Sequence, residues 1–411
     1  MTAQKRKVVI VGGGPAGLFA AEYLSRIDGL DVHLFDHKPS IGRKFLIAGR
    51  GGLNLTHSEE LESFLSKYGP AEDFLKPLIT DFNPRKLRDW AEGLGVETFV
   101  GTSGRVFPVE MKATGIIRAW SKRILDQGVT FHPGYSLTGI APTGDLIFQT
   151  SEESVELVSA DATLFAMGGL SYPHLGSTGN WIPALKDAGI DIRPFLPMNC
   201  GFEVNWSAYL ISKYSGEALK NIRVKYQDEV VPGDLILTDY GLEGGAIYAL
   251  SRELVKDLDR EKSEENEPVV VHLDLKPDMS ADRLRVKLES PRGKQSFSNY
   301  LRKALGLPPH IVALLHERAG DQLKTNEEII SAVKNLPITL TGARPIERAI
   351  SSLGGVKLES LTPELMVKDM PGIFVAGEMM DWDAPTGGYL LQACFATGLG
   401  AAKGIENYLK K

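Results

Sequence analysis

The first part of the chain alternates short apolar runs with one apolar helical stretch. Residues 7–11 and 32–35 form runs typical of buried strands, and residues 15–27 between them have the spacing of a helix. This order predicts a βαβ unit, which implies a parallel sheet covered by helices. Residues 60–125 have a mostly helical pattern, interrupted at Asn83-Pro84 and at residues 104–108. Short strands are expected over residues 129–148, and buried strands over residues 162–167 and 373–376.

The pattern changes after Pro194 and Pro197. Strand-like runs at residues 202–206, 223–226, 234–237 and 269–273 precede helical segments near 280–288, 298–319 and 325–335, the second broken at Pro308-Pro309. Thr325 with Glu328 fits a capping box, and the charged stretch 256–267 is a solvated loop or helix face. We therefore predict a discontinuous domain of residues 1–197 and 342–411, with residues 198–341 as an inserted domain.

Composition restricts the kinds of protein to consider. A chain of 411 residues with 43% hydrophobic and 24% charged residues is typical of a globular enzyme of more than one domain. The net charge of −6 and the lack of a basic stripe give no reason to expect nucleic acid as a partner. No run approaches the ~18 apolar residues that span a bilayer, nor the apolar region of a signal peptide. We expect a cytoplasmic protein without a membrane partner.

The cysteines and histidines form no recognisable catalytic or metal-binding arrangement. Cys200 and Cys394 have no C-x-x-C spacing, so disulfides and a thiol relay are not expected. Cys394 is interpreted as a small packing residue in the terminal helix. His310 and His316 are six residues apart, off a shared helix face, and are interpreted as surface or packing residues.

A glycine-rich turn links the first predicted strand to the first helix. Gly12, Gly14 and Gly17 follow the spacing of a dinucleotide-binding fingerprint. The first glycine permits the tight turn, the second lets the backbone approach a pyrophosphate, and the third lets helix pack on strand. Asp36 ends the next strand about 20 residues later, where an acid that binds the adenosine ribose belongs.

The fingerprint alone does not distinguish FAD from NAD, but the C-terminal segment does. Gly377 and Glu378 follow a buried strand, and Glu378 is suitably placed to fix the ribityl hydroxyls of a flavin. The helix beginning at Gly388, Tyr389 and Leu390 would direct its N–H groups at the pyrimidine edge, where charge accumulates on reduction. Another strand and helix of the sheet would explain the apolar residues but not these motifs.

Together these motifs resemble those of a known family. Residues 8–17 with Asp36, residues 165–169 and residues 374–378 are similar to the glutathione-reductase-like FAD superfamily. More narrowly, the chain resembles the BaiN-like flavoproteins, which include 3-dehydro-bile-acid reductase-like and aminoacetone oxidase-like members. That resemblance is carried by Gly42-Arg43-Lys44, residues 49–56, Gly104-Arg105-Val106-Phe107-Pro108, Ser171-Tyr172-Pro173, Gly176-Ser177-Thr178-Gly179 and Thr386-Gly387-Gly388-Tyr389.

The resemblance implies an α/β fold, in which a Rossmann-type FAD-binding domain assembled from discontinuous segments carries an inserted mixed β-barrel and helical domain. It also implies non-covalent FAD, and a small-molecule substrate held between insert and flavin. The residues expected to bind the cofactor are Gly12, Gly14, Pro15, Ala16, Gly17, Asp36, Arg43, Lys44, Gly49, Asn54, Gly168, Gly377, Glu378, Gly388, Tyr389 and Leu390. No residue is identified as a catalytic acid or base.

The chain departs from the family pattern at two places. The family commonly has Gly-Arg-Cys-Asn where this chain has Gly51-Gly52-Leu53-Asn54, so a cation and a thiol are missing. In the insert, the usual Ser-Gly-Pro is replaced by Glu243-Gly244-Gly245. Arg50 either takes over the missing charge or is a solvent-facing loop residue. These departures suggest a sub-branch and leave the substrate open.

The resulting hypothesis is an FAD-dependent oxidoreductase that transfers a hydride at flavin N5. Because one dinucleotide fingerprint is present, NAD(P)H is expected only as a transient electron donor. Two alternatives stay open: an NAD-only dehydrogenase, and a flavin-bound sensor or partner-binding protein without efficient turnover. The sequence leaves the oligomeric state undetermined.

Overall fold

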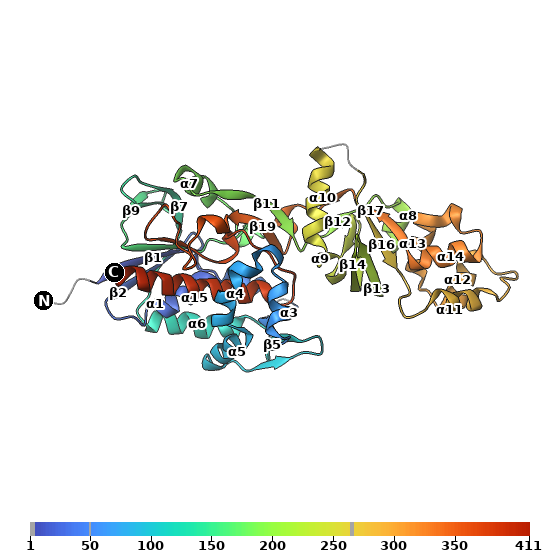
Figure 1. Ribbon diagram of the computed structural model, residues 1–411, viewed down its shortest axis with the longest axis horizontal. Helices are drawn as coiled ribbons and strands as arrows, with labels where there is room; N and C mark the ends of the chain where they lie inside the picture. The colour runs from blue at the N-terminus through green and yellow to red at the C-terminus, as the bar shows by residue number, and fades with distance from the viewer. Residues whose placement is uncertain (1–4, 49–50, 264–266) are drawn as a thin grey trace. The chain divides into compact units, whose positions relative to one another are not determined.

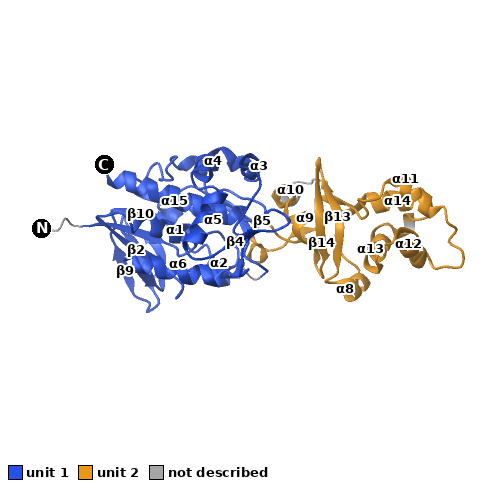
Figure 2. Ribbon diagram, turned by 90° about the horizontal axis from the view of Figure 1, so that it is seen from below, with its two compact units in different colours: residues 1–196, 351–411 blue, residues 197–350 orange. Residues whose placement is uncertain are grey.

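The computed structural model describes residues 5–48, 51–263 and 267–411, and the chain forms two compact units. Unit 1 contains Met1–Leu196 and Ser351–Lys411, and unit 2 contains Pro197–Ile350 (Figure 2). The expected insert, residues 198–341, lies within unit 2. Its assignment as a substrate domain stays a prediction.

Unit 1 is built on a five-stranded parallel sheet with the order β20-β10-β1-β2-β6. Its strands are β1 (Arg6–Val11), β2 (Leu30–Asp36), β6 (Thr130–Pro133), β10 (Ala162–Phe165) and β20 (Ile373–Val375). Val8, Val9 and Ile10 are completely buried, because a parallel sheet is covered on both faces. The apolar runs of the sequence therefore become the central strands of this sheet.

Helices cover one face of the parallel sheet (Figure 1). They are joined by an aromatic cluster in which Phe19 lies 5.1 Å from Phe395, Trp120 lies 5.4 Å from Phe395, and Trp90 lies 4.7 Å from Trp120, measured between ring centroids. These rings come from α1 (Pro15–Leu24), α5 (Pro84–Gly93), α6 (Thr114–Asp126) and α15 (Tyr389–Leu409).

A small antiparallel sheet packs against β2. It contains β7 (Tyr135–Ile140), β8 (Leu146–Thr150) and β9 (Val155–Val158), and Phe35 of β2 stacks on Phe148 of β8 with centroids 4.7 Å apart. Helices, parallel sheet and antiparallel sheet make a three-layer Rossmann-type domain, as expected from the sequence. Unit 1 further contains α2 (Arg43–Ala48), α3 (Leu61–Ser66), α4 (Glu72–Asp81), α7 (Trp181–Asp187), β19 (Ser351–Val356) and all but the last two residues of β11 (Ile192–Met198).

The segment between residues 60 and 125 is mostly helical with the predicted interruptions, but it also contains a hairpin that was not predicted. A hairpin of β4 (Thr98–Val100) and β5 (Arg105–Pro108) joins β3 (Thr56–His57) in a three-stranded sheet. Its turn is closed by the Gly101 N–H, which donates to the Arg105 carbonyl at 2.8 Å. Phe99 and Phe107 pair across the hairpin at 5.8 Å, a tertiary contact that a helical pattern does not reveal.

Unit 2 combines a seven-stranded sheet with helices, which agrees with the expected mixed β and helical insert. The sheet has the order β17-β16-β13-β14-β15-β12-β18, and its strand pairs are antiparallel. Its strands are β12 (Phe202–Glu203), β13 (Ala218–Tyr226), β14 (Glu229–Leu237), β15 (Gly241–Glu243), β16 (Val270–Asp274), β17 (Leu336–Thr339) and β18 (Gly342–Ala343). Its helices are α8 (Ala208–Tyr214), α9 (Gly245–Tyr248), α10 (Ser251–Ser263), α11 (Ala281–Leu288), α12 (Phe297–Leu305), α13 (Pro309–Ala319) and α14 (Asn326–Lys334).

Three local expectations in unit 2 are confirmed. The helical pattern breaks before Pro309, where α13 begins, and Thr325 with Glu328 forms the capping box of α14. The charged stretch begins on a solvated face of α10, where Asp259 and Arg260 are exposed, whereas Leu254 and Leu258 are buried on the other face. Within the part of the chain that the structure describes, no helix combines the length and apolar character needed to cross a membrane.

The capping box generates a stability prediction. The Thr325 hydroxyl oxygen accepts the Glu328 N–H at 3.3 Å, and Glu328 Oε2 accepts the Thr325 N–H at 2.7 Å. Thr325→Ala should lower the free energy of unfolding of unit 2 by about 1 kcal/mol, the usual cost of losing an N-cap. Ser331→Ala, which removes a hydroxyl within the same helix, is the matched control and should cost nothing. Chemical denaturation of both variants measures the difference, and equal midpoints would contradict the assigned cap.

Candidate functional site

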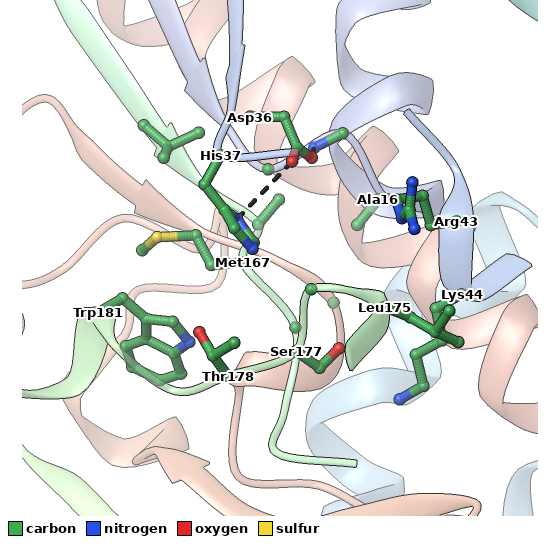
Figure 3. Close-up of a pocket in the computed structure, with 18 of the residues that line it drawn as sticks. Ala16, Asp36, His37, Arg43, Lys44, Met167, Leu175, Ser177, Thr178 and Trp181 are labelled. Atoms are coloured by element: carbon green, nitrogen blue, oxygen red, sulfur yellow. Dashed lines mark hydrogen bonds and ion pairs between the residues drawn. The ribbon is translucent and has the colours of Figure 1, made fainter. Parts of the chain in front are cut away.

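A cleft in unit 1 opens at the carboxyl ends of the parallel strands (Figure 3). Its wall contains residues at the carboxyl ends of four of these strands or within three residues of them: Gly12 after β1, Asp36 at the end of β2, Gly168 beyond β10, and Gly377 beyond β20. In open α/β sheets, ligands bind at this edge, where the strand order changes direction. The cleft therefore lies where the topology of unit 1 predicts a ligand.

The turn between β1 and α1 is held by direct backbone contacts. Gly12 has a φ of +112°, and a Cβ added there would lie 2.3 Å from the carbonyl oxygen of Ala166. A Cβ on Gly17 would lie 2.0 Å from the Gly12 carbonyl oxygen, so the third glycine lets α1 pack on the turn. Gly17 itself is not part of the cleft wall. Its role is structural.

The start of α1 is suited to an anionic ligand. Gly14 is the N-cap, and no side chain caps the helix. A Cβ on Gly14 would have no neighbour within 4 Å, so the space beside it belongs to the cleft. Pro15 and Ala16 complete this edge of the wall. Uncapped N–H groups at a helix N-terminus bind phosphate oxygens well, so the geometry fits a pyrophosphate.

Asp36 holds the glycine turn by hydrogen bonds and also lines the cleft. Its Oδ2 accepts the Gly13 N–H at 2.8 Å, and its Oδ1 accepts the Lys38 N–H at 2.7 Å. The carboxylate also lines the cleft. An ionised carboxylate offers about four lone-pair sites, so two remain for ribose hydroxyls.

Three buried polar atoms of the cleft wall have no hydrogen-bond partner among the described residues. They are Nε2 of His37, Nε of Arg43 and Nε1 of Trp181. Native structures leave few buried polar groups unpaired, and such groups are expected to meet a ligand or water. Their concentration around one cleft indicates that it is built to hold a polar molecule.

The other end of the cleft carries an internal charge network. Lys44 Nζ lies 2.5 Å from Glu378 Oε2 and 2.6 Å from the Ser171 hydroxyl oxygen. Glu378 Oε1 accepts the Ser352 N–H at 3.2 Å. Lys44 and Glu378 both line the cleft, and Figure 3 shows Lys44 far from Trp181. A fixed cation and a fixed carboxylate therefore face this end.

Cys394 also lies in the cleft wall, next to Glu378. Burial, with a smaller effect of the Glu378 charge, raises the pKa of this thiol to about 12. The sulfur is therefore a protonated thiol at neutral pH and not a nucleophilic thiolate. From the sequence, Cys394 was expected in the terminal helix near the flavin but was given only a packing role; the structure places it in the cleft wall.

The start of α15 packs closely against β3. Gly388 is the N-cap with a φ of +96°, and a Cβ there would lie 2.5 Å from the Cα of Thr56. The Tyr389 hydroxyl donates to Glu59 Oε1, and its ring stacks on His57 with centroids 5.7 Å apart. Burial, followed by the Glu59 hydrogen bond, raises the pKa of Tyr389. The helix begins where the sequence predicts.

The cleft brings together ten of the sixteen residues expected to bind the cofactor. These are Gly12, Gly14, Pro15, Ala16, Asp36, Arg43, Lys44, Gly168, Gly377 and Glu378. Asn54, Gly388, Tyr389 and Leu390 are not in its wall, and Gly49, like Arg50, lies outside the described residues. The buried Oδ1 of Asn54 has no partner within the described chain, so a ligand role for Asn54 stays a prediction.

Several residues of the cleft wall had no expected role in binding a ligand. The strand residues 135–137 carry no sequence signal for a site. The stretch around Trp181 carries one, because Gly176-Ser177-Thr178-Gly179 is a family motif, but its function was not assigned. The principal additions are His37, Tyr135, Ser136, Leu137, Met167, Leu175, Gly176, Ser177, Thr178, Asn180, Trp181 and Cys394.

Comparison with known proteins gives full-length relatives. The 3-dehydro-bile acid delta(4,6)-reductase of Clostridium scindens is 25% identical over 413 residues, which cover 95% of this chain and 97% of that protein. The ribosomal RNA dihydrouridine synthase of Escherichia coli is 24% identical, with 97% of each chain covered. The solved 3-ketosteroid delta1-dehydrogenase of Sterolibacterium denitrificans has a TM-score of 0.53 at 12% identity over 100% of both chains, which shows a common fold.

The family assignment follows from a match over nearly the whole sequence. Residues 6–404 match the model described as HI0933-like protein Rossmann domain. This match confirms the resemblance to the 3-dehydro-bile-acid reductase-like flavoproteins that the motifs predicted. The chain therefore belongs to the HI0933-like protein family, and unit 1 has the Rossmann-type fold that the family model describes.

Proposed function

We propose that this protein binds FAD non-covalently in the cleft of unit 1 and is an FAD-dependent oxidoreductase. The observation that carries the proposal is the set of unpartnered buried atoms on His37, Arg43 and Trp181, around a cleft that begins at an uncapped helix N-terminus. A dinucleotide would satisfy both features at once. When bound, FAD supplies a hydride acceptor and donor at N5 of the flavin.

Different residues of the cleft would bind different parts of the dinucleotide. The N–H groups at the start of α1, beside Gly14, would bind the pyrophosphate. Asp36 would accept hydrogen bonds from the adenosine ribose, and Glu378 would fix the ribityl hydroxyls. Lys44 holds the Glu378 carboxyl group in place through its 2.5 Å contact.

For the reaction, we propose hydride transfer between the flavin and a small organic substrate. The names of the bacterial relatives describe reductions of a carbon–carbon double bond, one in a 3-dehydro bile acid and one in a uridine of ribosomal RNA. The net charge of −6 favours a small substrate over RNA. We therefore favour the reduction of a double bond conjugated to a carbonyl group, with NAD(P)H as a transient donor.

The first test is the identity of the cofactor. The purified protein should be yellow and release FAD, not FMN, on heating or acid treatment, because the fingerprint with Asp36 binds a dinucleotide. Chromatography of the released flavin decides between them. Release of FMN, or a colourless protein that binds only NAD, would reject the proposal in favour of an NAD-only dehydrogenase.

The second test concerns Asp36. A hydrogen bond to a charged acceptor contributes about 1.5–3 kcal/mol, so Asp36→Ala should weaken FAD binding by about 10- to 100-fold. Asp31→Ala, which removes a carboxylate from the other end of the same strand, is the matched control and should leave affinity unchanged. Flavin fluorescence during titration of the flavin-free chain measures both. Equal affinities for the two variants would show that Asp36 does not bind the ribose.

The third test addresses the substrate. The photoreduced holoprotein should be reoxidised without oxygen by a 3-oxo-4-ene steroid faster than by buffer alone, with the double bond of the steroid reduced. A uridine-containing ribosomal RNA fragment is the second arm. Reoxidation by the RNA but not by the steroid would show that the substrate is a nucleic acid and not a small molecule. No reoxidation by either acceptor would favour the flavin-bound sensor.

A further inference from the structure

The segment from the end of β10 to the start of α7 forms part of the cleft wall. Leu175, Gly176, Ser177, Thr178 and Trp181 all line it. This segment carries the Gly176-Ser177-Thr178-Gly179 motif, to which the proposed function assigns no role.

Contacts place this wall beside the end of the cleft that Asp36 occupies. A Cβ added to Gly176 would lie 3.2 Å from Cε1 of His37 and 3.4 Å from Cγ of Lys38. Gly176 therefore packs directly against the residues that follow Asp36. The fingerprint assigns that end to the adenosine half of a dinucleotide.

Trp181 presents an unused donor to this end of the cleft. The residue is 4% exposed, and its buried Nε1 has no partner among the described residues. Figure 3 shows the nitrogen of the indole on the side that faces Thr178, another residue of the cleft wall. Buried indole N–H groups normally find an acceptor, so this one is arranged for an acceptor that the chain does not supply.

His37 presents the complementary group. Its Nε2 is buried without a partner in the described structure, and its Nδ1 lies 3.7 Å from Asp36 Oδ1. The neighbouring carboxylate favours the tautomer with the proton on Nδ1, which leaves Nε2 as an acceptor. Burial lowers the pKa of His37, which keeps the imidazole neutral at neutral pH.

We propose that Trp181 and His37 form the adenosine-recognition site of this protein, with the indole N–H donating to the adenosine half of the dinucleotide and His37 Nε2 accepting from it. Adenine suits this pair, since it carries ring-nitrogen acceptors and an exocyclic amino donor. The inference rests on the proposed binding of FAD and extends it to residues outside the glycine fingerprint. The motif before Trp181 then brings this wall segment against His37 through Gly176.

The test uses two ligands that share only the adenosine diphosphate half. The flavin-free full-length chain is titrated with FAD by flavin fluorescence and with ADP by calorimetry. Trp181→Phe keeps the aromatic ring but loses the N–H, and it should weaken FAD and ADP alike by about three- to tenfold, the value of one neutral hydrogen bond. Trp120→Phe is the matched control, because Trp120 also has a buried, unpartnered Nε1 but lies outside the cleft wall. It should leave both affinities unchanged.

A second pair of variants avoids changing a buried ring. His37→Leu should weaken both ligands by a similar factor, whereas His174→Leu, in the same wall segment but outside the lining, should weaken neither. Unchanged ADP affinity in both Trp181→Phe and His37→Leu would overturn the inference, as would a loss confined to FAD. If the parent chain binds neither ligand, the proposed function itself is wrong, so the two failures are distinguishable.

Discussion

The whole candidate site depends on the direct contact of backbone with backbone around the turn after β1. A side chain at Gly12 would collide with the Ala166 carbonyl, and one at Gly17 would collide with the Gly12 carbonyl. On the far side, a Cβ on Gly398 of α15 would lie 2.4 Å from the carbonyl oxygen of Ala16. These contacts fix the start of α1 between the end of β10 and the terminal helix. The uncapped N–H groups at the start of α1 are then accessible from the cleft.

The two ends of the cleft satisfy their polar groups in different ways. At one end, Lys44 and Glu378 bond each other, and Ser171 and the Ser352 backbone complete their network. At the other end, His37 and Trp181 each keep a buried atom without a partner in the described chain. A ligand thus gains new hydrogen bonds mainly near Asp36, while it meets preformed charges near Glu378. Binding strength would come from the end near Asp36, and orientation of the ligand from the end near Glu378.

Much of the architecture was predictable from local patterns. The βαβ opening, the buried strands and the capping box at Thr325 all follow from apolar spacing and side-chain chemistry within a few residues. The hairpin of β4 and β5 was missed, because its strands are short and its pairing with β3 joins residues far apart in the sequence. Gly388 was predicted to begin the last helix, but its tight contact with Thr56 required the folded chain.

The sequence by itself determined the family, the dinucleotide fingerprint and the residues that follow each parallel strand, because these depend on spacing along one stretch of chain. The tertiary structure decided which side chains share one cleft. It placed Trp181 and His37 in the wall of one cleft although they are 144 positions apart in the sequence. It also placed Lys44 on Glu378, and Cys394 beside them. No local pattern encodes such contacts, because they arise only when strands and helices from both ends of the chain close around the same sheet edge.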